Sequence, residues 1–306
     1  MLITNMPGPL PCPVLRPLLR IVLLLLLILS SCTKGDSRNT LLETETTNSA
    51  SQDGRSAGSV DPVEQYLTEG DSGLILDDFL DRILKAAEIP PDVAGKVSVA
   101  AAAGPSFILD LLTCLSGEPG LRTLVDKEHA LPGGYEPVDL VELGNGSCQV
   151  SRKGLLLRRM AAESLEEMAA AALAGGVTLV ASSAYRSYAY QEEVYARNVR
   201  ESGQEAADRE SARPGRSQHQ TGLAVDFGSI DDSFAETPAG LWMAANAGRF
   251  GWSLSFPDGY EEVTGYRWES WHYRYVGRDL VSFIDTYFGG IQQYALRFIY
   301  EWERAE

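Results

Sequence analysis

Histidine, cysteine and basic side chains are all scarce in this sequence. Among 306 residues there are three histidines, four cysteines and 26 Lys and Arg, against 42 Asp and Glu, which gives a formal net charge of -16. A surface this acidic argues against nucleic acid as a partner and against electrostatic docking on anionic lipid. The sequence also contains no repeat of fixed period and no phosphate-binding glycine loop. Its chemistry therefore has to be sought in a few short motifs.

The apolar run near the N-terminus is too short to span a bilayer. Ile21–Leu29 contains nine residues without a charge, whereas a spanning helix needs about 20. Arg16 and Arg20 precede this run and small residues follow it, an arrangement typical of a secretory signal. We therefore predict that residues 1–31 are a signal peptide and that the protein is exported. Removal of this signal peptide with its two arginines would change the net charge of the mature chain from -16 to -18.

The cysteine directly after these small residues resembles that of a bacterial lipobox. The resemblance implies that Cys32 becomes the lipidated first residue of the mature protein, anchored to a bacterial membrane and facing the periplasm or the cell surface. One acyl chain binds a membrane only marginally, so a stable anchor would need several chains at this cysteine. An ordinary signal peptide with an incidental Cys32 is the alternative.

Two segments of different composition follow. Residues 32–60 are rich in Ser, Thr, Asn, Gly and acidic residues and have almost no large apolar side chains. Such a segment cannot bury enough surface to offset its ordering entropy, so we predict a flexible tether. In residues 61–119, Leu, Ile and Phe recur mostly at spacings of three and four, which indicates a helical extension interrupted at Pro90-Pro91. This extension contains no motif, and we expect its role to be structural.

Two cysteines remain after the N-terminal ones are assigned. Cys12 lies in the predicted signal peptide and Cys32 directly follows it. In an oxidising compartment Cys114 and Cys148 could form a disulfide. Two separate buried thiols are the alternative, and the spacing does not choose between them.

The rest of the chain, residues 120–306, has the patterns of a mixed helix and strand domain. An Ala- and Leu-rich stretch stops at Gly175-Gly176, where a helix C-cap is expected. Short apolar runs with β-branched or aromatic residues indicate strands, and aromatic residues near the C-terminus recur at near-helical spacing. The predicted helices are 155–173, 190–200 and a pair within 280–302 interrupted at Gly289-Gly290, and the predicted strands are 177–181, 223–227 and 268–276.

Two of the three histidines lie in short motifs that also hold acidic residues. The first motif contains His219 and Asp226, and the second contains Glu269 and His272. Two imidazoles and one carboxylate can hold a zinc ion and leave its fourth position open, which distinguishes a catalytic site from a closed structural one. The pattern predicts His219, Asp226 and His272 as zinc ligands. Glu269 is then the general base that takes the proton of the attacking water.

This prediction imposes conditions on the local structure. Residues three apart on a regular strand point to opposite faces, so Glu269 and His272 share a site only if Glu269 lies at an irregular start of its strand. His219 and Asp226 can face one ion only if the loop between them folds back. Taken singly, each residue is more often a packed or turn residue than a ligand. The third histidine, His129, has no partner at ligand spacing, and we expect it to stand apart from the metal.

The motifs together match a known family. The stretch SQHQTGLAVD at 217–226, followed by ESWH at 269–272 and preceded by SAYRS at 183–187, closely resembles the zinc D-alanyl-D-alanine carboxypeptidases of the VanY type. The resemblance covers residues 124–277. It implies an α+β fold in which helices surround a small, mainly antiparallel sheet, with the zinc in a cleft and peptidoglycan stem peptides as substrate.

The resemblance also places Arg186 in the active site. Its planar guanidinium would stabilise the tetrahedral intermediate there, whereas without the other motifs an arginine after a strand would be interpreted as a surface ion-pair partner. Tyr185, Ser187, Gln191 and Ser217 are weaker candidates for holding the substrate.

Three functions are compatible with these residues. The first is a D,D-carboxypeptidase that removes the terminal D-alanine from a stem pentapeptide. The second uses the same metal chemistry as an L,D-carboxypeptidase, a D,D-dipeptidase or an endopeptidase on peptidoglycan peptides. The third is a lipoprotein that binds cell-wall peptide or metal without turnover, and Glu269 and Arg186 argue against it because a pure binder needs neither. The sequence does not separate the first two.

Overall fold

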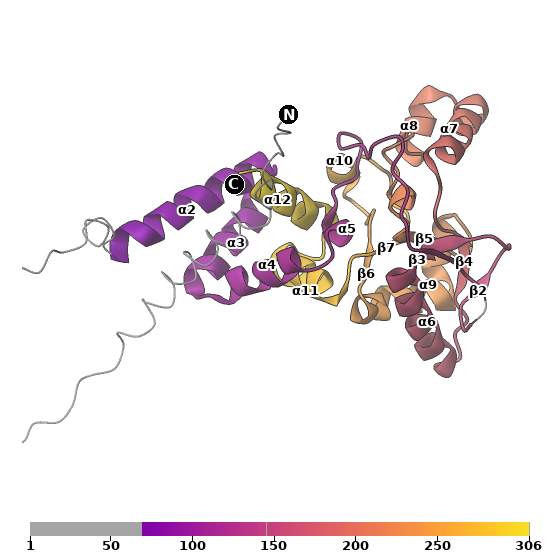
Figure 1. The fold of residues 1–306 in the computed structure, drawn as a ribbon, viewed down its shortest axis with the longest axis horizontal. Helices are drawn as coiled ribbons and strands as arrows, with labels where there is room; N and C mark the ends of the chain where they lie inside the picture. The colour runs from indigo at the N-terminus through magenta and orange to yellow at the C-terminus, as the bar shows by residue number, and fades with distance from the viewer. Residues whose placement is uncertain (1–68, 145, 306) are drawn as a thin grey trace, which may run out of the picture. The chain divides into compact units, whose positions relative to one another are not determined.

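The computed structural model of the chain describes residues 69–144 and 146–305 (Figure 1). The predictions for the signal peptide, for Cys32 and for the tether fall outside these residues and stay predictions. The chain divides into two compact units within helix α2 (Glu69–Ala86), between Arg82 and Ile83. Every element described below belongs to the second unit, which runs to Ala305.

Three helices follow α2 and pack with the C-terminal part of the second unit. They are α3 (Pro91–Ala103), α4 (Ser106–Ser116) and the short α5 (Pro119–Arg122). Phe107 of α4 is fully buried, with ring centroids 5.6 Å from Phe283 and 5.9 Å from Phe298. The helix α4 thus shares a core with the C-terminal helices, and the domain boundary predicted at residue 120 stays a prediction. In the described ranges no single helix is long and apolar enough to cross a membrane, and only α3 and α4 joined, bent by 104°, would pass.

A five-stranded sheet forms the centre of the second unit (Figure 1). Its order is β2-β4-β5-β7-β6, in which β2 pairs with β4 in parallel and all other neighbours are antiparallel. A separate antiparallel pair joins β1 and β3. The mainly antiparallel sheet of the expected α+β fold is thus confirmed. The strands are β1 (Leu140–Glu142), β2 (Gln149–Val150), β3 (Leu156–Arg158), β4 (Val180–Ser183), β5 (Ala224–Phe227), β6 (Trp252–Leu254) and β7 (His272–Tyr275).

Helix α6 (Arg159–Ala174) supplies the helical side of the main core. Its buried residues Leu165 and Met168 belong to the same hydrophobic cluster as Phe227 and Trp252 of the sheet. The helix ends at Gly175 as predicted, but it begins later than predicted because β3 occupies the preceding residues and pairs with β1. Apolar periodicity alone does not separate a short strand from the helix that follows it.

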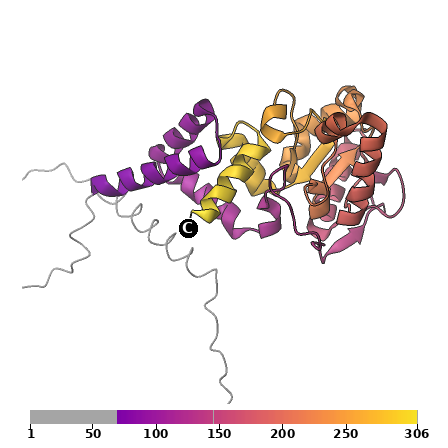
Figure 2. The same cartoon turned by 90° about the horizontal axis from the view of Figure 1, so that it is seen from above.

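The remaining helices surround the sheet on the way to the C-terminus. The helices α7 and α8 pair with each other, and Tyr195 of α7 donates a hydrogen bond of 2.6 Å to Asp208 of α8. The helices α11 and α12, drawn in yellow, lie side by side and are the predicted terminal pair (Figure 2). The α-helices are α7 (Tyr188–Ser202), α8 (Gln204–Glu210), α9 (Pro238–Asn246), α10 (Glu261–Thr264), α11 (Arg278–Tyr287) and α12 (Gln292–Arg304), and the 3-10 helices are η1 (Gln218–Thr221), η2 (Asp232–Glu236) and η3 (Ala247–Phe250).

The two cysteines of the second unit are free, so the disulfide between Cys114 and Cys148 is wrong and the alternative of separate buried thiols holds. Cys114 lies on α4, whereas Cys148 directly precedes β2, where its thiol faces the carbonyl oxygen of Leu179 at 3.9 Å. Burial raises the pKa of both thiols to about 12. Neither sulfur is therefore a nucleophile at neutral pH.

Candidate active site

His219 lies in the turn η1, which folds the chain back onto strand β5. The hydroxyl of Ser217 caps this turn and accepts a hydrogen bond of 3.3 Å from the backbone N–H of His219. Gly222 ends the turn in the left-handed conformation, at φ 69°, which glycine adopts without steric cost. The chain then enters β5 with every residue buried. This local structure brings His219 back towards Asp226.

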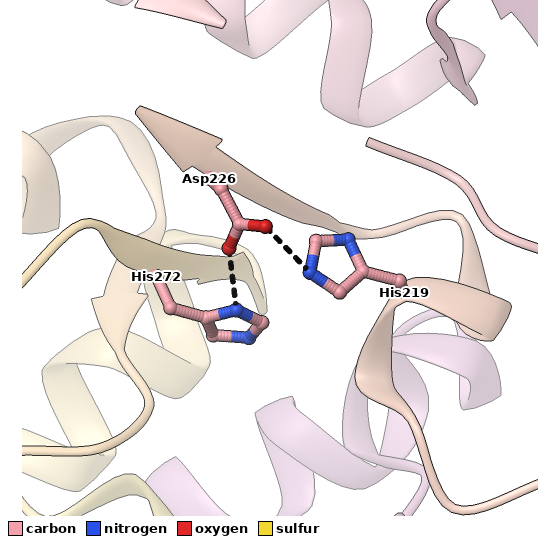
Figure 3. A group of neighbouring side chains, drawn as sticks. All are labelled: His219, Asp226 and His272. Carbon is pink, nitrogen blue, oxygen red and sulfur yellow. Dashed lines mark hydrogen bonds and ion pairs between the residues drawn. The ribbon is translucent and has the colours of Figure 1, made fainter. Parts of the chain in front are cut away.

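Asp226 and His272 lie directly opposite each other on the neighbouring strands β5 and β7. Asp226 Oδ1 is 2.9 Å from His272 Nδ1, and Asp226 Oδ2 is 3.1 Å from His219 Nε2 (Figure 3). The candidate ligand atoms of the three residues lie within 4.8 Å of one another. All three side chains are buried, and they converge on one point within the protein.

Glu269 lies in the turn before β7, outside the regular strand. The backbone N–H of His272 donates to the carbonyl oxygen of Glu269 at 3.2 Å, and the N–H of Glu269 donates to the carbonyl oxygen of Phe256 at 3.0 Å. This turn puts the two side chains on the same side, with Glu269 Oε2 3.8 Å from His272 Nδ1. The Glu269 carboxylate is therefore close to the three candidate ligands but does not belong to that group.

Whether the three residues fit a metal depends on the hydrogen-bond partner of the other ring nitrogen of each histidine. His219 Nδ1 lies 2.7 Å from the carbonyl oxygen of Ala184, and His272 Nε2 lies 3.2 Å from the side-chain oxygen of Gln218. Each of these nitrogens faces an acceptor that can hold the ring proton, which would leave the lone pairs of His219 Nε2 and His272 Nδ1 for a metal. Metal-bound histidines typically have this arrangement. Two nitrogens and one carboxylate oxygen, with room for a further ligand, fit zinc at a catalytic site.

Burial and neighbouring charges shift the pKa values of three residues at this site. Burial, together with the neighbouring Arg186 cation, lowers the pKa of His219 to about 4, so its imidazole is neutral at pH 7. Burial opposes the ionisation of Asp226, but the two histidines hold its pKa well below the usual range. Burial and the nearby Asp226 charge raise the pKa of Glu269 to about 8. A neutral His219 imidazole and an ionised Asp226 carboxylate are the ligand states that a divalent cation requires.

Arg186 reaches the same point from the segment after β4. Its Nη2 donates to Asp226 Oδ2 at 2.9 Å and lies 2.9 Å from His219 Nε2. Its Nη1 donates to the side-chain oxygen of Gln191 at 3.2 Å, and its Nε donates to the Ser183 hydroxyl at 3.1 Å. These contacts hold the guanidinium in one orientation beside the three candidate ligands.

A cavity of about 220 Å³ opens onto these residues and is lined by His219, Asp226, His272, Glu269 and Arg186. Its wall also contains residues that the sequence motifs did not identify, among them Glu210, Arg216, Tyr266 and Arg267. Arg216 directly precedes the first motif and Arg267 lies two residues before Glu269, so proximity along the chain was the only available signal.

The polar side chains on this wall differ in how many ion pairs and hydrogen bonds they already form within the protein. Arg267 forms ion pairs with Asp232 at 2.7 Å and with Glu210 at 3.2 Å. Arg216 donates a hydrogen bond to the carbonyl oxygen of Lys127. The buried hydroxyl of Tyr266 has no hydrogen-bond partner within the described part of the chain. Arg216 and Tyr266 therefore retain hydrogen-bonding capacity towards a bound peptide.

The four predicted substrate-binding residues take different positions. Ser217 lines the cavity. Gln191 is fully buried and contacts Arg186, while its amide nitrogen donates to the carbonyl oxygen of Ala212 at 2.7 Å. Ser187 caps helix α7 by accepting from the backbone N–H of Tyr190. Neither Ser187 nor Tyr185 belongs to the cavity lining, so direct substrate contact for these two stays a prediction.

His129 stands apart from the three candidate ligands. Its Nδ1 lies 2.8 Å from Asp126 Oδ1, and its ring packs at 4.6 Å against Tyr300. The second carboxylate oxygen of Asp126 accepts a hydrogen bond of 2.6 Å from Gln293. This is a structural cluster that ties the start of the domain to helix α12.

Comparison with known proteins identifies related sequences. The family model VanY, described as D-alanyl-D-alanine carboxypeptidase, matches residues 154–278. The chain is 36% identical over 183 residues to YodJ of Bacillus subtilis, which is named as a carboxypeptidase; the match covers 58% of this chain and 67% of that one. It is 30% identical over 163 residues to VanXYC of Enterococcus gallinarum, named as a bifunctional D-Ala-D-Ala dipeptidase and D-Ala-D-Ala carboxypeptidase, which covers 50% of this chain and 82% of the relative.

The solved structures include a related fold. The LD-carboxypeptidase LdcB aligns with a TM-score of 0.50 and 36% sequence identity, over 55% of this chain and 85% of that chain. Coverage of other relatives is lower, since the chain spans 58% and 45% of the D-alanyl-D-alanine carboxypeptidases of Enterococcus faecalis and Enterococcus faecium. The residues matched by the family model, 154–278, include both motifs.

Proposed function

The chain belongs to the VanY family of zinc D-alanyl-D-alanine carboxypeptidases, and from that premise we propose that it removes the terminal D-alanine from peptidoglycan stem peptides. The observation that carries this proposal is the convergence of His219, Asp226 and His272 on one point of a cavity that also holds Glu269. The names of two relatives specify D-Ala-D-Ala as the bond that those proteins cleave.

His219 Nε2, an oxygen of Asp226 and His272 Nδ1 would hold the zinc ion, because these are the atoms that face one another across the site. Bound zinc would polarise the scissile carbonyl and lower the pKa of water. The hydrogen bonds from the outer ring nitrogens to Ala184 and Gln218 keep both imidazoles in the required tautomer. Asp226 stays ionised because its pKa is held low by the two histidines.

Glu269 moves the proton. Its carboxylate Oε2 lies at the cavity wall, 3.8 Å from His272 Nδ1, where it accepts a proton from the attacking water and returns it to the leaving amine of D-alanine. Burial raises the pKa of this group to about 8, while the cations Arg186 and Arg267 oppose that rise. A group whose pKa lies near the working pH can both take and return a proton efficiently.

Arg186 stabilises the negative charge that develops on the carbonyl oxygen. Its guanidinium lines the cavity and is held from behind by Gln191 and Ser183. Donors that are fixed before the reaction stabilise a developing oxyanion without reorganisation, and each is worth about 10²–10³ in rate. Arg186 Nη2 contacts Asp226 Oδ2 and His219 Nε2, each at 2.9 Å.

A second candidate activity is L,D-carboxypeptidase, which removes the terminal D-alanine from a tetrapeptide. The specific observation in its favour is the 36% identity and 0.50 TM-score to LdcB, a protein named as an LD-carboxypeptidase. The residues described above would perform the same chemistry on either bond. Discrimination would then depend on the wall residues that contact the penultimate residue of the substrate.

The activity is tested by mass spectrometry of a stem pentapeptide and a stem tetrapeptide after incubation with the zinc-loaded protein. Loss of one alanine from the pentapeptide alone supports the D,D-carboxypeptidase. Loss from the tetrapeptide alone assigns the L,D activity instead. If zinc binds and neither peptide changes, the carboxypeptidase proposal is wrong, and cross-linked and dipeptide substrates would test the endopeptidase and dipeptidase activities before non-catalytic binding is accepted.

We also propose that the protein acts outside the cytoplasmic membrane, held there by lipid on Cys32. The support is the basic, apolar and small-residue order that leads to this cysteine, and the extracytoplasmic location of the proposed substrate. Palmitate labelling of the wild type and of Cys32→Ala in a bacterial host tests the anchor. We expect label only in the wild type, and equal labelling of both proteins would refute it.

A further inference from the structure

A buried polar network lies behind His272, on the side of the ring that faces away from Asp226. Gln218, Ser255 and Gln292 form it, with exposed fractions of 4%, 2% and 1%. His272 Nε2 is 3.2 Å from Gln218 Oε1, and the Ser255 hydroxyl donates to the same oxygen at 2.7 Å. Gln218 Nε2 donates to Gln292 Oε1 at 3.5 Å, and Gln292 Nε2 donates to the carbonyl oxygen of Ser253 at 3.3 Å.

One arrangement of donors and acceptors in this network fits a metal bound by His272 Nδ1, with the Ser255 hydroxyl closer to Gln218 Oε1, at 2.7 Å, than to Gln292 Oε1, at 3.4 Å. With a metal on His272 Nδ1, which faces Asp226, the ring proton would lie on Nε2 and be donated to Gln218 Oε1. The oxygen of Gln218 then accepts two hydrogen bonds, from His272 and from Ser255, so its amide nitrogen must point towards Gln292. The amide oxygen and the amide nitrogen of both glutamines therefore each have a hydrogen-bond partner, as buried amide groups require.

The network joins three segments that are distant in the sequence. Gln218 belongs to the turn η1, Ser253 and Ser255 belong to or follow β6, and Gln292 is the first residue of helix α12. Gln292 is separated from Gln218 by 74 positions. The C-terminal helix, in which no motif was found, thus supplies a side chain that supports the environment of a candidate metal ligand.

We propose that Gln218, Ser255 and Gln292 form a positioning relay that fixes the orientation and tautomer of His272, so that helix α12 contributes to metal affinity. The inference rests on the proposed metal site. Gln218 contacts the ring directly, whereas Ser255 and Gln292 act by holding the amide of Gln218. Partners of this kind typically change metal affinity by about 10- to 100-fold when they are removed.

Zinc affinity measured by competition with a chromophoric chelator tests the relay. Gln218→Leu, which removes the acceptor at nearly constant volume, is expected to weaken zinc binding by about 10- to 100-fold. Gln218→Glu retains an acceptor oxygen and is expected to keep most of the affinity. Gln292→Leu is expected to give a smaller loss than Gln218→Leu, because it leaves the acceptor present but less firmly held.

Gln293 provides a matched control on the same helix. It is also a buried glutamine, exposed by 3%, but its amide donates to Asp126 and is not connected to His272. Gln293→Leu is expected to lower the melting temperature about as much as Gln292→Leu while leaving zinc affinity unchanged. Equal losses of affinity in these two variants would show that α12 acts only through general stability, and would overturn the proposal.

The tautomer of His272 gives a second readout that is independent of turnover. With only three histidines in the sequence, long-range proton–nitrogen spectra of the zinc-loaded protein can be assigned directly. The wild type is expected to show a slowly exchanging Nε2–H for His272, and Gln218→Leu a rapidly exchanging one. If both proteins retain the slow proton, the relay is refuted. If the wild type cleaves no stem peptide but Gln218→Leu still loses zinc affinity, the proposed activity fails and the relay stands.

Discussion

Glu269 is the residue whose substitution separates proton transfer from metal binding. Its carboxylate is close to His272 but lies outside the set of three candidate ligands. We expect Glu269→Gln to lower kcat by about 10²–10⁴, the usual contribution of a general base, while zinc stoichiometry stays at one. Turnover rates and metal content of the same preparation check this. Substantial residual activity would show that another group accepts the proton.

The raised pKa of Glu269 also predicts a pH dependence of stability in the metal-free protein. Burial and Asp226 raise this pKa from 4.5 to about 8, so between these values the folded state binds a proton that the unfolded chain has lost. The stabilisation is fully present below about pH 4.5 and is lost as the pH rises towards about 8.

Urea unfolding with a chelator present measures this effect, with Glu269→Gln as the control that cannot titrate. We expect the free energy of unfolding of the wild type, relative to the variant, to decrease as the pH rises from 4.5 to about 8. Parallel pH profiles for the two proteins would mean that the carboxyl group is not buried as described.

The residues that we propose to carry the chemistry could be identified from the sequence, whereas most residues of the cavity wall could not. His219, Asp226, Glu269 and His272 lie in two short motifs, so residue type and spacing indicated them together. Tyr266 and the other wall residues are common residue types whose position at the cavity results from the fold. Gln218 lies between motif positions, but its contact with α12 depends on a pairing over 74 residues that no local pattern encodes.

The turn between η1 and β5 sets the distance between two candidate ligands, and Gly222 is its critical position. At φ 69° an added Cβ would lie 3.0 Å from side-chain atoms of both Arg158 and Leu140. We expect Gly222→Ala to cost at least about 1–2 kcal/mol of stability from the left-handed conformation alone, and also to weaken zinc binding because the turn must shift.

Gly259 is the matched control for this substitution. It also has a positive φ, 80°, but an added Cβ would meet nothing within 4 Å. Gly259→Ala should therefore show a similar conformational cost with unchanged zinc affinity. Thermal unfolding and zinc titration of both variants separate the two effects. Unchanged zinc affinity in Gly222→Ala would contradict the role of the turn.

The type of each predicted helix or strand was more accurate than its first and last residues. The helix α6 begins at Arg159 because the three preceding residues, Leu156–Arg158, pair as β3 with β1, which is adjacent only in the folded protein. Similarly, β7 begins at His272 although the aromatic pattern starts at Trp268, because the turn at Glu269 interrupts it. In both cases a tertiary contact or turn, which apolar periodicity does not contain, sets the boundary.

The second unit has a hydrophobic core that does not depend on the metal. Leu157, Leu165, Val225 and Phe227 are fully buried in one cluster beside the site. We therefore expect chelation to leave the protein folded at 25 °C and to lower its melting temperature by on the order of 5–10 °C, which corresponds to a ligand present at about 100 times its Kd. Scanning calorimetry with and without chelator measures this. Loss of the cooperative transition on chelation would show that the metal is required for folding.

Amino-acid composition predicted the structure of the whole molecule less well than the motifs did. Four cysteines and an expected oxidising compartment were compatible with a disulfide, yet Cys114 and Cys148 are buried on different elements as free thiols. Pairing depends on the distance between two side chains in the fold, which sequence spacing does not provide. The α+β class, by contrast, was implied by the family resemblance, and the terminal helix pair was predicted from near-helical spacing over many residues. The structure confirms both.

Anomalous diffraction at the zinc edge from crystals of the zinc-loaded protein tests the central claim most directly. We predict a single strong peak in contact with His219 Nε2, a carboxylate oxygen of Asp226 and His272 Nδ1, with Glu269 outside bonding distance. The same data would show His272 Nε2 still within hydrogen-bond distance of Gln218. A zinc ion bound elsewhere, or bound directly by Glu269 in place of one of these three residues, would contradict the account of the site.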